Sequence, residues 1–137
     1  MAGLEKLIIA NEDDSISFGN HETQEKQKLE GFELNGEVYK VKTHNEITRL
    51  EKNGRLLFES VPGTTVSDLK LNSDSMSFSL IGSAEDAQVT VELEADEEYT
   101  VYINEVQLGK VKSNLAGKIS FSVDFAIGSQ TVQIKKH

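Results

Sequence analysis

The sequence predicts an all-β protein in which a C-terminal immunoglobulin-like β-sandwich follows a small antiparallel β-hairpin unit. Two observations predict this class. Apolar residues alternate with polar ones in many short segments, and turn-forming residues separate those segments about every 8–12 residues. A period of two with one apolar face is typical of a half-buried antiparallel strand. The polar stretch 22–30 has no apolar stripe at helical spacing, so we expect a loop that leads into a strand.

Two Asn-Gly pairs predict tight hairpins in the first half of the chain. Asn35-Gly36 and Asn53-Gly54 each separate two segments that contain apolar residues. A two-residue type I′ turn requires positive φ at both central positions, which Asn and Gly tolerate. Five or six strands are therefore expected before Pro62-Gly63.

The second half contains the clearest alternation, with about seven short strands expected between Thr65 and Lys136. The alternating segments are 75–80, 88–94, 99–104, 118–124 and 131–135. Pro62-Gly63 is the natural boundary, which divides the chain into a small antiparallel β unit at residues 1–62 and the sandwich at 63–137. The length suits one domain, or two small β units that share a core. Six phenylalanines are expected in that core: Phe18, Phe32, Phe58, Phe78, Phe121 and Phe125.

Composition excludes several classes of function. The chain has 137 residues, 14 Lys and Arg against 23 Asp and Glu, a net charge of −9, no Cys and no Trp. Without Cys there are no disulfides, thiolate metal sites, iron–sulfur clusters or Cys nucleophiles. An acidic chain repels phosphate backbones, so no nucleic-acid partner is expected.

The N-terminal region carries no pattern of a targeting or spanning segment. The longest apolar stretch near the start is 7–10, whereas a secretory signal needs 7–15 apolar residues and a spanning helix about 20. We therefore expect no membrane insertion and a cytoplasmic protein, or a surface or extracellular assembly reached by an unconventional route.

No motif for catalysis, a cofactor or a metal is present. The three histidines, His21, His44 and His137, lie far apart, and the carboxylate clusters lack the alternating spacing of calcium loops. Gly-x-Ser-x-Gly and the glycine-rich phosphate loops are also missing. We expect no cofactor, no metal and no catalytic residue.

Tyr102 is the one candidate for a binding surface. Strand alternation places it on the face opposite to Tyr99, and hence outward. An exposed Tyr stacks on sugars or anchors protein interfaces. The alternative, that Tyr102 is an ordinary surface residue, remains open.

Lysines on two predicted strands suggest protected sheet edges. Lys110 and Lys112 lie on one strand, and Lys135 and Lys136 lie on the last. Charges on an edge strand block unwanted pairing, whereas an edge left open for a particular partner permits strand addition between subunits.

Five blocks resemble a family of short, cysteine-poor proteins from anaerobic Gram-positive bacteria that is catalogued under the name endosialidase. They are SISFGN (15–20), VYKVKT (38–43), EKNG (51–54), ESVPGT (59–64) and NLAGKISFSV (114–123). The resemblance runs over nearly the whole chain and consists of strand and turn segments rather than an active-site motif.

The family name implies hydrolysis of sialic acid linkages, which uses three arginines to hold the sugar carboxylate. This chain has only Arg49 and Arg55, and Lys does not reproduce the planar bidentate fork of Arg. A six-bladed propeller also needs more than twice this length. No catalytic residue is therefore carried over, and endosialidase activity is not expected.

The sequence favours a non-catalytic structural protein that self-associates or forms part of a bacterial surface or fibre-like assembly. The expected partner is a second copy or another protein of an assembly. One alternative is an accessory module that binds a glycan or a protein through Tyr102. A second alternative is a hydrolase whose site forms between subunits.

Overall fold

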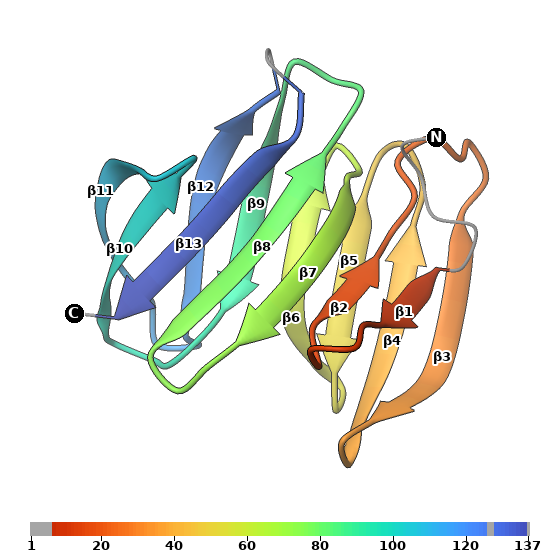
Figure 1. Cartoon of the computed structure of the whole chain (residues 1–137), viewed down its shortest axis with the longest axis horizontal. Coiled ribbons are helices and arrows are strands. Elements are labelled where there is room, and N and C mark those ends of the chain that lie inside the picture. Colours follow the sequence, from red (N-terminus) through yellow and green to blue (C-terminus); the bar gives the residue numbers. More distant parts are fainter. Residues whose placement is uncertain (1–6, 126–127, 137) are drawn as a thin grey trace.

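The computed structural model describes residues 7–125 and 128–136 as a sandwich of two antiparallel sheets (Figure 1). The predicted all-β class and β-sandwich are confirmed, and the described residues form strands and no helix. Within these ranges, accordingly, no helix has the length and apolar character needed to cross a membrane.

Sheet A, which faces the viewer in Figure 1, has seven strands in the order β1-β2-β7-β8-β13-β10-β11. Their bounds are β1 (Ile8–Ala10), β2 (Ile16–Phe18), β7 (Thr65–Leu71), β8 (Ser75–Ile81), β13 (Gln130–Lys136), β10 (Glu98–Ile103) and β11 (Val106–Lys112). The last strand of the chain, β13, inserts between β8 and β10, so that the C-terminal segment lies in the middle of the sheet.

Sheet B lies behind it and has six strands in the order β12-β9-β6-β5-β4-β3. Their bounds are β12 (Lys118–Asp124), β9 (Asp86–Glu92), β6 (Arg55–Val61), β5 (Thr48–Lys52), β4 (Glu37–Thr43) and β3 (Gln27–Leu34). Six strands therefore precede Pro62 and seven follow it, as the sequence predicts.

Both sheets contain strands from the two sides of the boundary predicted at 62/63. In sheet A, β2 pairs with β7, and in sheet B, β6 pairs with β9. One cluster of buried apolar side chains runs through both segments. The two sets of strands share this core.

Aromatic side chains from both sheets fill the centre of the core. Phe58 of β6 lies edge-to-face against Phe18 of β2 and against Phe78 of β8, with ring centroids 5.4 Å apart in each pair. All three rings are buried, so this layer ties the two sheets together. Phe121 and Phe125 are also buried, as predicted, whereas Phe32 is half-buried at the margin of the core.

The two Asn-Gly turns have the geometry that the sequence predicts. Asn35 and Asn53 have φ of 51° and 52°, and the glycines that follow them have φ of 80° and 81°. Positive φ at both central positions defines the type I′ turn, whose twist matches the flanking strands.

The lysines predicted to protect edges fall into two groups. Lys110 and Lys112 lie on β11, which pairs only with β10 and is an edge of sheet A. The prediction is wrong for Lys135 and Lys136, because β13 pairs on both sides. An alternating segment reveals a strand but not its place in the sheet.

Candidate functional site

Tyr102 lies on the outer face of sheet A. It stands directly opposite Gln107 of β11 and Gln133 of β13, and the Lys135 ammonium lies 5.4 Å from its ring centroid. Tyr99 is buried while Tyr102 is half-buried, which is the alternation expected for a strand with one face in the core. The ring and its cation therefore form one polar platform on the sheet.

Small polar side chains continue this platform across β8. Ser77 stands opposite Gln133, and Ser79 stands opposite Thr131, with 3.3 Å between the two hydroxyl oxygens. This part of the outer face of sheet A is thus polar and rich in hydroxyl and amide groups. Such a surface offers hydrogen bonds to an extended ligand or to another protein.

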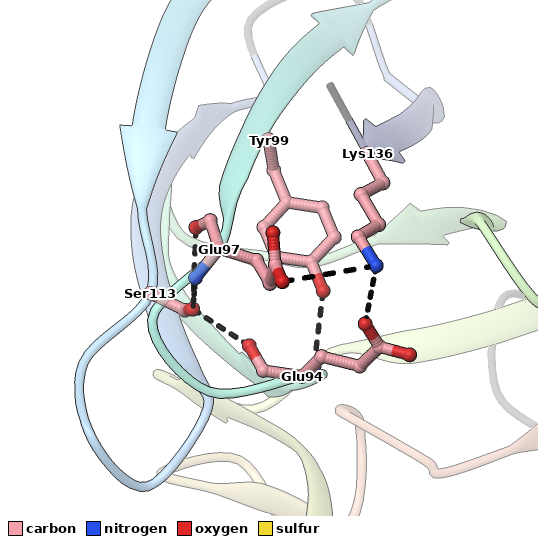
Figure 2. A network of polar contacts seen from close by, with 5 residues as sticks. All are labelled: Glu94, Glu97, Tyr99, Ser113 and Lys136. Carbon is pink, nitrogen blue, oxygen red and sulfur yellow. Dashed lines mark hydrogen bonds and ion pairs between the residues drawn. The ribbon is translucent and has the colours of Figure 1, made fainter.

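A polar corner fixes the end of the sandwich where β9 passes from sheet B to β10 in sheet A (Figure 2). The Glu94 N–H donates to the Tyr99 hydroxyl over 3.0 Å, and the Ser113 hydroxyl donates to the Glu94 carbonyl over 2.6 Å. The Lys136 ammonium bonds the Glu94 carboxylate over 2.5 Å, which raises the pKa of Lys136. These contacts hold the corner to the last strand.

A cleft of about 360 Å³ lies beside this corner, between the ends of the two sheets. Its charged and polar lining residues include Arg55, Asp74, Glu92, Glu94 and Asn72. Arg55 pairs with Glu92 and Lys136 pairs with Glu94, so two of these three carboxylates already face a cation. The cleft offers hydrogen bonds and paired charges to a small polar ligand.

Of the two histidines among the described residues, His21 is the buried one. Its N–H and its Nδ1 lie 3.2 and 2.7 Å from the Thr65 hydroxyl oxygen, and burial lowers the pKa of His21 against an opposing effect of Glu22. His44 is half-buried in the β4–β5 loop, and His137 lies outside the described residues. In the part of the chain that the structure describes, no group of three or more potential ligands is placed to hold a metal ion.

The structure brings together cations that sequence reasoning missed. On the outer face of sheet B, Lys42 of β4 stands directly opposite Lys28 of β3 on one side and Arg49 of β5 on the other. Repulsion from Lys26 is the main cause that lowers the pKa of Lys42, and Lys40 and Lys28 lower it further. Like charges directly opposite one another destabilise a sheet. We call these five residues the basic face: Lys26, Lys28, Lys40, Lys42 and Arg49.

Carboxylates neutralise this basic face only in part. Glu30 lies 2.9 Å from the Lys28 ammonium and 3.5 Å from that of Lys40, and Glu59 lies 2.6 Å from the Arg49 guanidinium. Among the described residues, Lys42 has no carboxylate within ion-pair distance. The centre of the basic face is therefore cationic although the chain as a whole is acidic.

The opposite end of the same sheet is acidic. Asp86, the first residue of β9, stands directly opposite Asp124, the last residue of β12, and Glu85 precedes Asp86. We call these three residues the acidic corner. Sheet B thus carries opposite charges at its two ends.

Comparison of the chain with family models, curated proteins and solved structures finds no match. The resemblance to the endosialidase family therefore stays a prediction.

Proposed function

We propose that the chain is a non-catalytic structural protein that self-associates or forms part of a surface or fibre-like assembly. The observation that carries this proposal is β11, a seven-residue edge strand that exposes apolar side chains. Val106 is 69 % exposed and Leu108 is 54 % exposed. Neighbouring exposed apolar residues on an edge strand are typical of a protein contact.

The contact that β11 offers is its side-chain surface rather than its free edge. The register of the β10–β11 ladder shifts between Val101 and Tyr102, so Leu108 has no partner and forms a bulge. A bulge together with Lys110 and Lys112 disfavours simple edge-to-edge pairing. A partner that covers Val106 gains apolar burial without needing that edge.

Light scattering after size exclusion, with negative-stain images of the same fractions, tests the proposal. We expect a mass above that of one chain, which increases with protein concentration, and particles of repeating shape. A single species with the mass of one chain at every accessible concentration contradicts the proposal.

A second candidate function is an accessory module that binds a glycan or a protein on the outer face of sheet A. The pairing of the Tyr102 ring with Lys135 supports it, because an aromatic platform beside a hydrogen-bonding row suits a sugar ring. A glycan array tests this candidate. We expect Tyr102→Ala to abolish a hit and Tyr102→Phe, which keeps the ring, to retain it. An array without hits, or a hit unchanged by Tyr102→Ala, contradicts this candidate.

A further inference from the structure

We infer that copies of this chain join head to tail, with the β11 end of one copy overlapping the β3 end of the next. This inference rests on the proposed self-association and names the two surfaces that meet. It is carried by the stagger of the two sheets and by the charges at the ends of sheet B.

Sheet A projects beyond sheet B at the β11 end. Figure 1 shows β10 and β11 to the left of β12, which is the last strand of sheet B on that side. Val106 stands opposite Ile103, so both side chains lie on the face of sheet A that points toward sheet B. Ile103 and Val111 are only half-buried, and Val106 is mostly exposed. Within residues 7–125 and 128–136, no strand covers this projecting strip of inner face.

Sheet B projects beyond sheet A at the opposite end. There β3 lies beyond β1 (Figure 1), and β1 has only three residues against the eight of β3. Leu29 stands opposite the buried Val41 and so lies on the inner face, yet it is 40 % exposed. Phe32 and Leu34 of the same strand are half-buried. A second strip of inner face is therefore incompletely covered, and it belongs to the other sheet.

The two strips fit each other in a repeating joint. When a second copy is placed beyond the β11 end in the same orientation, its β3 enters the space beside β12 and beneath β11. Five antiparallel ladders separate β3 from β12 in one sheet, so these two strands run in opposite directions. Translation thus sets β3 of the second copy antiparallel to β12 of the first, which is the geometry of strand addition.

The edge of β12 is the one best suited to accept such a strand. Its ladder with β9 runs through seven consecutive pairs without a shift, whereas β3 and β11 carry bulges and β1 is short. The main-chain N–H and C=O of Lys118 both bond to Asn114. By alternation, the same groups of Ser120 and Ser122 point away from β9, toward an incoming strand.

Charge favours the same joint. Lys28 lies near the start of β3, and Asp124 is the last residue of β12. Because the two strands run in opposite directions, these positions lie at the same end of the sandwich. The joint therefore brings the acidic corner of the first copy to the basic face of the second, so that opposite charges meet.

A joint between two different surfaces is heterologous, so it closes into a ring or grows into a fibre. A head-to-tail joint also predicts a result that a two-fold symmetric contact does not predict. Blocking either end alone must stop growth, and two variants blocked at opposite ends must still join each other.

The test uses sedimentation velocity on two variants of the full chain. Val106→Asp blocks the β11 end and Leu29→Asp blocks the β3 end, because each places a carboxylate in an apolar contact. We expect each substitution to raise the dissociation constant about tenfold or more, and the unmodified chain to form species larger than a dimer. Circular dichroism confirms folding. If Leu29→Asp does not fold, Lys28→Glu takes its place at the same end.

The decisive sample is the equimolar mixture of the two variants. It should contain a dimer and nothing larger, because each variant keeps one intact end. Leu115→Asp, at the most exposed apolar residue of the β11–β12 loop, is the matched control and should assemble like the unmodified chain. If only one variant blocks growth, or the mixture yields no dimer, the head-to-tail joint is wrong while self-association stands. If the unmodified chain is a monomer throughout, the proposed function is wrong as well.

Discussion

The hydroxyl of Tyr99 accepts a hydrogen bond from the main-chain N–H of Glu94, five residues earlier, over 3.0 Å. Tyr99 is the second residue of β10, where the chain returns to sheet A after it leaves sheet B at β9, and its ring is buried. The bond thus fixes the crossover between the two sheets in the same way as the tyrosine corner of immunoglobulin-type sandwiches.

Tyr99→Phe should lower the free energy of unfolding by about 1–2 kcal/mol, because the Glu94 N–H loses its acceptor while the ring still fills the core. Urea unfolding followed by circular dichroism measures this change. Tyr102→Phe is the matched control, since it removes a hydroxyl for which the structure shows no such bond to the main chain. Equal stability of Tyr99→Phe and the unmodified chain would contradict the role given to the corner.

Gly117→Ala should be more destabilising than Gly31→Ala. Both glycines have positive φ, 82° and 72°, so both alanines carry the same backbone strain of about 1 kcal/mol. A Cβ at position 117 would also lie 2.3 Å from the Leu93 carbonyl oxygen, whereas one at position 31 meets nothing within 4 Å. Chemical denaturation of the two variants measures the difference between their unfolding free energies. Equal losses of unfolding free energy would show that the loop at Gly117 moves aside freely.

The free energy of unfolding should fall as the pH is lowered from neutral, because His21 binds a proton more readily in the unfolded chain. Burial lowers the pKa of His21 in the folded state, so below the unfolded value of about 6.5 the unfolded chain binds the proton more readily. The loss therefore starts near pH 6.5 and is complete only below the folded pKa. His21→Gln should flatten the dependence of unfolding free energy on pH in this window, and His44→Gln should not. An unchanged slope in His21→Gln would contradict the assignment.

Lys42→Glu should affect stability and association in opposite directions. Within one copy it removes repulsion with Lys28 and Arg49, so the unfolding free energy should rise by about 0.2–1 kcal/mol. Between copies it places a carboxylate near the acidic corner, so the dissociation constant should rise by about two- to tenfold.

Adding Asp86→Lys to Lys42→Glu should restore part of the lost association, because the charges at the two ends are then exchanged. Lys70→Glu, on sheet A, is the control for the change in net charge. Denaturation and sedimentation equilibrium on the same samples separate the two effects. If the double variant associates no better than Lys42→Glu, the basic face does not meet the acidic corner.

The sequence predicts the strands and their faces well because local chemistry determines both. The alternation around Phe78 and Phe121 marks inner and outer faces, and Asn-Gly at 35–36 and 53–54 selects the hairpin turns. The turn at Asn104 and Glu105 has φ of 51° and 69° and takes the same form without a glycine. The residue type at this turn is a weaker signal than Asn-Gly, because Glu is not a residue typical of positive φ.

The order of the strands and the charged faces depends on long-range pairing, which a local pattern does not reveal. The insertion of β13 between β8 and β10 makes Lys135 a neighbour of Tyr102 rather than an edge residue. Lys28 meets Lys42 only because a bulge between Leu29 and Phe32 shifts the register. A hairpin counted from Asn35-Gly36 without that bulge pairs Lys28 with Thr43, and the basic face does not appear.

Sedimentation velocity of the unmodified chain, over a wide range of protein concentration at low and at high salt, examines head-to-tail self-association without any substitution. We expect the weight-average sedimentation coefficient to rise with concentration, and to rise less at high salt because salt screens the charges at the joint. A single monomeric boundary at every concentration and at both salt levels would contradict it.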